Sequence, residues 1–405
     1  MNIMTVPTPN SVLNACLPMV ASKSESNRAL ILRALAGADK IALDNLSAAR
    51  DTRLLEALLQ SDEEELDPQD AGTTTRFLTA WCVAANRPAL ITGSPRMQER
   101  PIGILVDALK ALGADITYVK NEGFCPLRIN GFKQVTRRVS MRGDVSSQYV
   151  SALLLIASFL DQGLELTLEG TIASRPYIDM TIEWMARFGL KVSEQNQTFT
   201  VEPQTPEPGR YAIESDWSAA GYWYSLMALR GQGELKLMYL RDESLQGDRQ
   251  LADLFVELGV NSEFVEDGVV LRPGPRKEKF EADFLHISDQ AQTFAVCCAG
   301  LGIPAKLTGL PSLRIKETDR IAAIQTELAK FGCEVEVIGD EAMLLPGGAL
   351  DVSGQEIHTY DDHRMAMAFA PLAALGELSM DEAEVVAKSY PSFWEDWALV
   401  CPKEA

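Results

Sequence analysis

Histidine is scarce in this sequence, with three residues, His286, His358 and His363, among 405. They are dispersed, whereas a zinc site needs three or four ligands gathered in one place. The seven cysteines are odd in number and form no Cys-x-x-Cys pair. This pattern is typical of reduced thiols in a cytoplasmic protein, and it argues against both a zinc site and a disulfide framework.

The sequence also has few long uncharged runs and fewer basic than acidic residues. The longest uncharged run, residues 1–22, contains three prolines, and runs such as 290–305 are too short to cross a bilayer. No basic residue precedes Lys23, although a secretory signal needs a positive start. Lys and Arg number 37 against 57 Asp and Glu, so the net charge is −20. We therefore expect no nucleic-acid partner, no membrane and a cytoplasmic location.

What the sequence does contain is a repeat. A polar residue that precedes a nearly all-apolar helical stretch recurs at intervals of 49, 73, 72, 71 and 73 residues. We call these stretches the anchor helices, and because they are apolar on most sides we expect them to be buried. They begin near Ser24, Thr73, Ser146, Ser218, Asp289 and Asp362.

A second, amphipathic helix follows roughly thirty residues into most units and ends in glycine. The four clearest examples are 101–113, 177–189, 248–259 and 319–332. Short runs of alternating apolar and polar residues, such as 164–168, predict strands with one covered face. Six such units predict an α/β fold with three units in each of two similar domains. A solenoid is the alternative, but residues 1–20 indicate strand and turn rather than a polar cap.

Basic residues gather at the starts of these helices, where the helix dipole favours acids instead. Examples are Lys23, Arg28, Arg100, Lys316 and Arg320. For a single arginine, a salt bridge inside the fold explains this well. Several bases at equivalent places in a repeat are better explained by a shared site for an external anion, which free N–H groups at helix starts would also bind.

The remaining polar residues limit the chemistry. No nucleophile elbow, P-loop or dinucleotide fingerprint occurs. A metal-free site rich in Lys and Arg, with the carboxylates Asp289, Glu317 and Asp319, suits a transfer between two phosphorylated or carboxylated small molecules. A carboxylate would then move a proton, although each of these carboxylates alone is also a typical helix cap.

Seven motifs, in chain order from about residue 20 to 397, resemble those of the EPSP synthase (3-phosphoshikimate 1-carboxyvinyltransferase) family. They are Ser22-Lys23-Ser24-x-Ser26-Asn27-Arg28, Ala71-Gly72-Thr73-x-x-Arg76, Arg96-Met97-x-Glu99-Arg100-Pro101, Ser146-Ser147-Gln148-Tyr149, Lys316-Glu317-Thr318-Asp319-Arg320, Asp362-His363-Arg364-Met365 and Lys388-Ser389-Tyr390-Pro391.

The resemblance implies the two-domain α/β fold of the enolpyruvyl transferases, with six repeated units and a cleft between the domains that closes on the substrates. Residues 1–20 and 231–405 would form one domain and residues 21–230 an inserted one, with a crossover at 230–233. The implied reaction moves the enolpyruvyl group of phosphoenolpyruvate to the 5-hydroxyl of shikimate 3-phosphate. It yields 5-enolpyruvylshikimate 3-phosphate and phosphate, a step of aromatic amino acid biosynthesis, without metal or organic cofactor. We expect a monomer.

The resemblance also implies residue roles at the matching positions. Shikimate 3-phosphate would be held by Lys23, Ser24, Arg28, Ser146, Ser147, Gln148, Ser174, Asp289, Ser312 and Lys316. Phosphoenolpyruvate would be held by Lys23, Gly72, Arg100, Gln148, Arg320, Arg364 and Lys388. The implied catalytic residues are Asp289, which accepts the proton of the attacking hydroxyl, Glu317 with Lys388, which exchange a proton with the methylene carbon, and Lys23. Supporting roles would fall to Tyr177 and His363.

Three positions depart from the family pattern. Ala21 replaces a glycine, and Ser312 replaces an asparagine whose substrate contact is therefore in question. Asp70 also replaces an asparagine and places an acid near a phosphate site, so Asp70→Asn is expected to bind phosphoenolpyruvate more tightly.

Three other functions remain to be weighed. UDP-N-acetylglucosamine enolpyruvyl transferases share the fold and the donor, but their catalytic cysteine is missing from residues 93–97 here. A non-catalytic sugar-phosphate sensor would not need the proton carriers Asp289 and Glu317. A polyanion-binding module conflicts with the net charge of −20.

Overall fold

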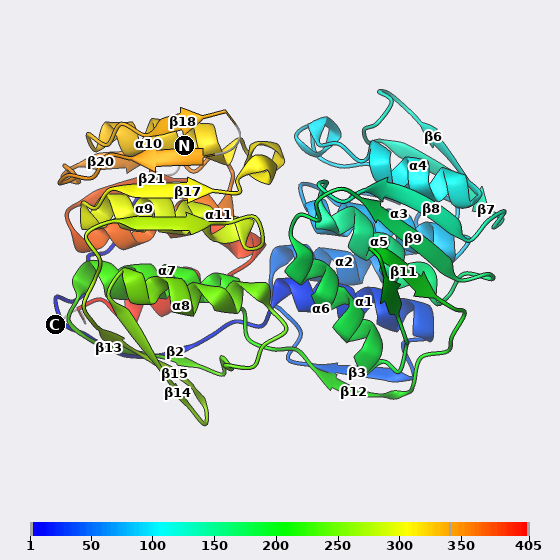
Figure 1. Cartoon of the computed structure of the whole chain (residues 1–405), viewed down its shortest axis with the longest axis horizontal. Coiled ribbons are helices and arrows are strands. Elements are labelled where there is room, and N and C mark those ends of the chain that lie inside the picture. The colour runs from blue at the N-terminus through cyan, green and yellow to red at the C-terminus, as the bar shows by residue number, and fades with distance from the viewer. Residues whose placement is uncertain (1–2, 340–341, 403–405) are drawn as a thin grey trace. The chain divides into compact units, whose positions relative to one another are not determined.

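The structure is a computed structural model that describes residues 3–339 and 342–402 (Figure 1). Contacts within the chain divide it into two compact units. Unit 1 consists of Met1–Ser22, Ala48–Arg50 and Glu214–Ala405, and unit 2 of Lys23–Ser47 and Asp51–Ile213. In the described part of the chain, each unit holds three small sheets and three buried helices. The predicted fold class, α/β with three repeats in each of two domains, is confirmed.

The predicted domain boundary at residues 230 and 231 needs a correction. Helix α7 (Trp217–Arg230) packs against α8 (Leu251–Glu257), α9 (Ala291–Leu301) and η5 (Ala370–Ala374), all of which belong to unit 1. The division between the units therefore falls at residues 213 and 214, and Gly231 is the left-handed C-cap of α7. An apolar helix belongs with the elements that cover it, and sequence pattern alone does not identify those elements.

Unit 2 follows the repeat closely. Its helices are α1 (Lys23–Ala36), α2 (Arg50–Gln60), α3 (Gly72–Ala84), η1 (Met97–Glu99), α4 (Gly103–Leu112), α5 (Ser147–Ala157) and α6 (Arg175–Arg187). Its strands are β3 (Ile41–Asp44), β4 (Glu65–Leu66), β5 (Ala89–Ile91), β6 (Ala114–Tyr118), β7 (Leu127–Phe132), β8 (Arg138–Arg142), β9 (Leu164–Glu169), β10 (Ser193–Gln195), β11 (Thr198–Val201) and β12 (Gly209–Ala212).

The anchor helices α1, α3 and α5 pack against one another at the centre of unit 2. The strands form sheets in the orders β12-β3, β4-β5-β7-β6 and β10-β11-β9-β8. Strand β9 alternates buried and half-exposed residues, as expected for a sheet with one covered face. The prediction of buried anchor helices is confirmed, because nearly every residue of α3 and α5 is buried.

Unit 1 has the same plan. Its remaining helices are η2 (Gly247–Gln250), η3 (Ser288–Gln290), η4 (Pro311–Ile315), α10 (Arg320–Lys330), α11 (His363–Phe369), η6 (Ala383–Lys388) and α12 (Phe393–Ala398). Its strands are β1 (Ile3–Thr5), β2 (Leu13–Pro18), β13 (Gly233–Met238), β14 (Val260–Val265), β15 (Gly268–Pro273), β16 (Phe280–Asp283), β17 (Ala305–Thr308), β18 (Glu336–Ile338), β19 (Ala342–Leu345), β20 (Gln355–Ile357) and β21 (Leu378–Asp381).

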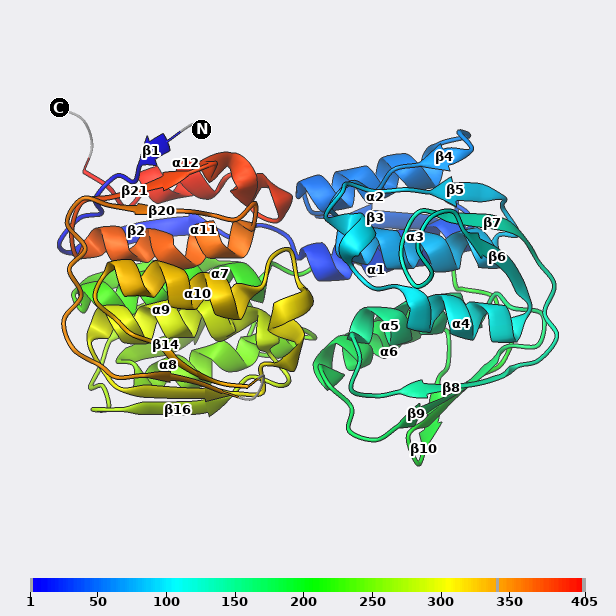
Figure 2. The ribbon, with the colours of Figure 1, turned by 90° about the horizontal axis from the view of Figure 1, so that it is seen from above.

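In unit 1 the anchor helices α7, α9 and α11 lie side by side (Figure 2). The three surrounding sheets have the orders β1-β21-β20, β14-β15-β13-β2 and β16-β17-β19-β18. Nearly every residue of α7, α9 and α11 is buried, so these helices form the core of the unit. Among the described residues, no helix has the length and apolarity to span a membrane.

The ends of the helices show how well local sequence signals work. Asp319 and Asp362 cap α10 and α11 with their side chains, as helix-start signals predict. Helix α1 begins at Lys23, so Ser24 and Ser26 lie inside its first turns. The Ser26 hydroxyl instead accepts a hydrogen bond from the Ser47 amide at 3.0 Å. Gly37 directly follows the end of α1 and has a positive φ of 102°, a conformation that favours glycine.

Candidate active site

In unit 2 the starts of α1 and α2 are joined by a buried ion pair. Lys23 is the first residue of α1, and its Nζ lies 3.0 Å from Oδ2 of Asp51, near the start of α2. The two side chains are only 14% and 5% exposed. A carboxylate this close fixes the position of the ammonium group by a charge-assisted hydrogen bond. Sequence reasoning identified Lys23 but missed Asp51, whose only signal was an acidic residue at a helix start.

Arg28, one turn further along α1, is almost entirely engaged by the fold. Its nitrogens donate to Thr181 Oγ1 at 2.8 Å, to the Ser24 carbonyl at 2.8 Å, to Ser151 Oγ at 3.2 Å and to the Tyr177 carbonyl at 3.0 Å. These bonds use most of the five donors of a guanidinium group. Burial lowers the pKa of Arg28 to about 10, against the opposing charges of Tyr177 and Glu25, so the side chain stays cationic at neutral pH.

The start of α3 holds a second pair of cations, Arg76 and Arg100, both buried. A Cβ built on Gly72, the first residue of α3, would lie 2.8 Å from both terminal nitrogens of Arg100. Arg76 donates to the Gly72 carbonyl at 3.2 Å and to the Pro101 carbonyl at 2.6 Å, so it ties the Arg100 segment to the helix start. Burial and the charge of Arg100 lower the pKa of Arg76. Cations this close to free helix N–H groups favour an anion there.

The start of α5 meets the start of α3. Ser146 caps α5, with its Oγ accepting from the Gln148 amide at 3.3 Å. The Gln148 side chain donates to Thr73 Oγ1 at 3.2 Å. Ser147 is buried beside them, whereas Ser174 stands at the start of α6 in a left-handed conformation without a side-chain cap bond. The structure therefore places the Gln148 side chain at the start of α3, next to Gly72 in the chain.

In unit 1 the carboxylate of Asp289, in η3, is the centre of a cluster of cations. Its Oδ1 accepts from Lys316 Nζ and from Arg320 NH1, each at 3.1 Å, and its Oδ2 accepts from Arg364 NH2 at 3.0 Å. These bases come from the residue after η4, from the start of α10 and from the start of α11. Three bases that the sequence predicted separately therefore meet at the carboxylate of a fourth predicted residue.

Arg320 links Asp289 to two more acids. Its Nε donates to Asp362 Oδ2 at 2.7 Å, and its NH2 donates to Glu317 Oε2 at 2.9 Å. Arg320 is 1% exposed and Asp362 fully buried. The sequence suggested an external anion as the partner of Arg320, but internal carboxylates already balance this charge. Asp362 was missed as a site residue, although it belongs to a quoted motif.

These neighbours set the protonation of Asp289. Burial raises the pKa of its carboxyl group, but Arg364, Lys316 and Arg320 together lower it more, while Glu317 acts in the opposite direction. The net result is a pKa well below the ordinary value. Asp289 is therefore ionised at neutral pH, and it is a weak base for as long as the three cations remain on it.

Three further predicted residues lie nearby in unit 1. Lys388 is fully buried at the end of η6, which packs against α11. His363 is the first residue of α11, with its Nδ1 3.5 Å from Asp362 Oδ1. Ser312 lies in η4, four residues before Lys316. The elements that carry these residues thus adjoin the Asp289 cluster.

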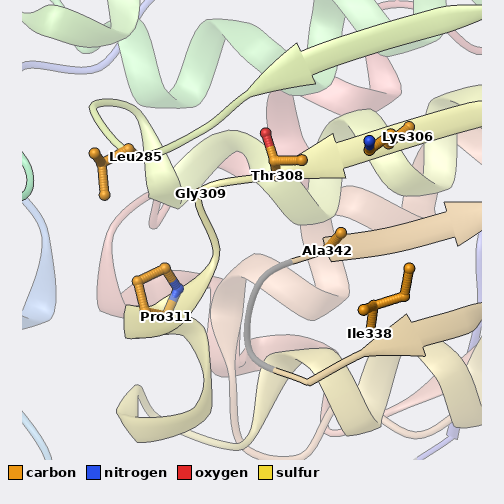
Figure 3. Close-up of a pocket in the computed structure, with 7 residues that line it drawn as sticks. All are labelled: Leu285, Lys306, Thr308, Gly309, Pro311, Ile338 and Ala342. Atoms are coloured by element: carbon orange, nitrogen blue, oxygen red, sulfur yellow. The ribbon is translucent and has the colours of Figure 1, made fainter.

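A pocket elsewhere on unit 1 has a different character (Figure 3). It is lined by Leu285, Lys306, Thr308, Gly309, Pro311, Ile338 and Ala342. Lys306 is the one charged residue of this set, and none of the predicted site residues belongs to it. We therefore assign no substrate to it. Over residues 3–339 and 342–402, no cluster of three His, Cys, Asp or Glu suited to a metal ion is found.

Comparison with known proteins gives concordant results. A family model described as EPSP synthase (3-phosphoshikimate 1-carboxyvinyltransferase) matches residues 56–397. A 3-phosphoshikimate 1-carboxyvinyltransferase from Bacteroides fragilis (strain YCH46) is 46% identical over 390 residues, which cover 95% of each chain. One from Aliivibrio fischeri (strain MJ11) is 37% identical over 419 residues, 96% of this chain and 97% of the other.

Among solved structures, an EPSP synthase from Acinetobacter baumannii has a similar fold. The TM-score is 0.77 at 18% sequence identity, and the match covers 99% of this chain and 98% of that chain. At this low identity the structural match supports the fold alone.

Proposed function

The chain belongs to the EPSP synthase (3-phosphoshikimate 1-carboxyvinyltransferase) family, and we propose how its two groups of charged residues carry out that family's reaction. The protein transfers the enolpyruvyl group of phosphoenolpyruvate to shikimate 3-phosphate in the shikimate pathway. The names of the relatives favour this acceptor over a nucleotide sugar. Because the chain is an enzyme, the sensor hypothesis is set aside.

The observation that carries the proposal is that Lys316, Arg320 and Arg364 all bond the carboxylate of Asp289. All three are proposed ligands for substrate anions. A phosphate or carboxylate that takes over their N–H groups leaves Asp289 with fewer cationic partners. The pKa of Asp289 then rises, because the charges that lowered it are shared with the substrate. Substrate binding would thus turn a weak base into one that accepts the proton of the 5-hydroxyl.

Glu317 is the residue proposed to transfer a proton to and from the methylene carbon of phosphoenolpyruvate. Its Oε2 accepts from Arg320 NH2 at 2.9 Å, beside the bases proposed for phosphoenolpyruvate. In the protonated form Glu317, with Lys388, donates a proton to the methylene carbon. The adjacent carbon gains cationic character and the acceptor oxygen attacks it. Glu317 then removes a proton from the new methyl group while phosphate leaves, which re-forms the carbon–carbon double bond and gives the enol ether of the product.

In unit 2 the proposed contacts are of two kinds. Lys23, Arg100, the N–H groups at Gly72 and the Gln148 side chain would hold phosphoenolpyruvate by charge-assisted hydrogen bonds. Shikimate 3-phosphate would be held by Lys23, Ser24, Arg28, Ser146, Ser147, Gln148 and Ser174. Because its donors are largely engaged within the fold, Arg28 would contribute mainly positive charge.

In unit 1, Lys316 and Asp289 would contact shikimate 3-phosphate, together with Ser312, which lies in η4 four residues before Lys316. Arg320, Arg364 and Lys388 would hold phosphoenolpyruvate. A monomeric state, a cytoplasmic location and independence from cofactors stay predictions. Light scattering coupled to size-exclusion chromatography checks the first, and activity after chelation checks the last.

A phosphate-release assay tests the proposal. Purified protein is given phosphoenolpyruvate with either shikimate 3-phosphate or UDP-N-acetylglucosamine, and phosphate is followed over time. We expect release with the first pair alone, and loss of that release in Asp289→Asn and Glu317→Gln. Release with the nucleotide sugar instead would overturn the acceptor assignment. Full activity in both variants would overturn the proposed proton carriers while leaving the reaction intact.

A further inference from the structure

The turn that carries Asp289 is held in place by hydrogen bonds of the next residue, Gln290. This side chain is fully buried. Its Nε2 donates to Asp248 Oδ2 at 2.8 Å and to the Ser218 carbonyl at 3.3 Å. Asp248 lies in η2 and Ser218 in α7, so one amide group ties the Asp289 turn to two other elements of unit 1. No motif quoted for the family resemblance includes Gln290.

The acceptor at the centre of this network is a single oxygen. Asp248 Oδ2 also accepts from Ser218 Oγ at 2.5 Å. Asp248 is 3% exposed, and burial raises the pKa of its carboxyl group, against the charge of Arg364. A buried carboxylate is costly unless it is hydrogen-bonded, so its two neutral donors matter to it. We refer to Ser218, Asp248 and Gln290 as the Gln290 network.

Gly221 on α7 makes room for this network. A Cβ built at this position would lie 2.4 Å from Gln290 Oε1, closer than non-bonded atoms approach. Its backbone is helical rather than left-handed, so conformation alone does not call for glycine there. The absence of a side chain is therefore explained by space for Gln290.

The main-chain carbonyl of Asp289 is held as well. The Gln292 side chain donates to the Asp289 carbonyl, and Arg364 NH1 approaches the same carbonyl at 3.4 Å. The turn is therefore held both by the Gln290 side chain, which bonds to η2 and α7, and by the two groups that bond to the Asp289 carbonyl. Its carboxylate is thereby presented to the three cations.

We propose that Gln290 is a positioning residue: by bonding Asp248 and Ser218 it holds the Asp289 carboxylate where Lys316, Arg320 and Arg364 converge. The proposal rests on the proposed role of Asp289 as proton acceptor. A shift of about 1 Å in a catalytic group lowers turnover strongly while substrates still bind. A role confined to stability would instead reduce the folded fraction and leave kcat unchanged.

The first test replaces Gln290 by leucine, which keeps the volume and removes the hydrogen bonds. We expect kcat to fall about tenfold, with KM for both substrates within about twofold. The matched control is Gln134→Leu in unit 2, where a buried glutamine donates to the carbonyls of Thr136 and Gly163. That variant is expected to melt at a lower temperature with unchanged kcat. Wild-type kcat in a folded Gln290→Leu would overturn the proposal.

The second test is a double-mutant cycle that does not require the leucine variant to fold. Gly221→Ala should displace Gln290 and lower kcat severalfold. In a Gln290→Ala background the added methyl meets no amide, so Gly221→Ala should have no further effect. Equal losses in both backgrounds would contradict the proposal, because the methyl group would then act without Gln290.

The third test uses Asp248. Both hydrogen bonds end on Oδ2, so Asp248→Asn can retain them by presenting its amide oxygen there. We expect Asp248→Asn to keep kcat within about threefold and Asp248→Leu to match Gln290→Leu. Identical kcat values for the asparagine and leucine variants would overturn the network.

Asp289→Asn serves as the reference throughout. If it kept wild-type turnover, the proposed role of Asp289 would fail. If it were inactive while Gln290→Leu was fully active, the positioning role alone would fail.

Discussion

The guanidinium group of Arg100 lies directly against Gly72, in the space that a side chain at residue 72 would occupy. Both terminal nitrogens of Arg100 are 2.8 Å from the position of a Cβ there. The contact joins a cation to the first residue of α3, whose free N–H groups attract anions. Any larger residue at position 72 must therefore move Arg100.

We expect Gly72→Ala to raise KM for phosphoenolpyruvate about tenfold, because the methyl group displaces a charge-assisted donor. Binding of shikimate 3-phosphate alone should change less than about twofold. Steady-state kinetics and calorimetry measure the two effects. Gly131→Ala is the control, since the nearest atom to its added Cβ is 3.6 Å away. Unchanged KM in Gly72→Ala would show that Arg100 does not hold this substrate.

The pair formed by Lys23 and Asp51 gives a second prediction. We expect Asp51→Asn to lower kcat/KM about tenfold or more, because the ammonium group loses the carboxylate that fixes it 3.0 Å away. Glu56→Gln is a matched control, since Glu56 on α2 pairs with Arg33 on α1 at 2.7 Å. That more exposed pair should affect stability alone. Equal loss of kcat/KM in both variants would contradict a specific role for Asp51.

These contacts mark the limit of what the sequence could predict. The basic residues at the helix starts were identifiable, because their type and spacing recur along the chain. Their acidic partners were not, since Asp51 is 28 residues from Lys23 and Asp362 is 42 residues from Arg320. Such pairs exist only after the repeats fold onto each other, and any acidic residue along the chain is an equal candidate.

The boundary between the units could not be predicted from the sequence for a similar reason. The six anchor helices look alike in sequence, and α7 carries no signal for which neighbours cover it. Conversely, α10 was predicted almost to the residue, as 319–332 against Arg320–Lys330, because a cap, an amphipathic face and a terminal glycine are all local signals. Sequence thus predicted local elements well, and left the long-range contacts to the structure.

The proposed proton transfer by Glu317 can be tested with Asp319, two residues further along the chain, as the control. We expect Glu317→Gln to lower kcat by 100-fold or more, on the order of a general acid–base contribution, with binding of shikimate 3-phosphate nearly unchanged. Asp319→Asn is the control, because asparagine also caps helices and can retain the bond from the Ala322 amide. A binding loss in Glu317→Gln as large as its rate loss would make the residue structural.

The next prediction concerns the charge of Asp289. Asp289→Asn leaves Lys316, Arg320 and Arg364 without the carboxylate that they share, so these cations become available to an added anion. We expect the variant to bind inorganic phosphate about tenfold more tightly than the wild type while it loses turnover. Calorimetry with phosphate measures the first effect. Equal or weaker phosphate binding would indicate that the three cations do not form an anion site.

The same substitution predicts how stability depends on pH. The folded-state pKa of Asp289 lies well below the ordinary value of 3.8 for an aspartate, so the ionised carboxylate stabilises the fold at pH values above about 4. This stabilisation is lost as the pH falls from the unfolded-state pKa through the lower folded-state value. Asp289→Asn should therefore be less stable by about 3 kcal/mol at pH 7, and equally so at pH 5, with a smaller difference at pH 3.5. Urea unfolding at these three pH values measures the difference, and one that stayed constant down to pH 3.5 would contradict the lowered pKa.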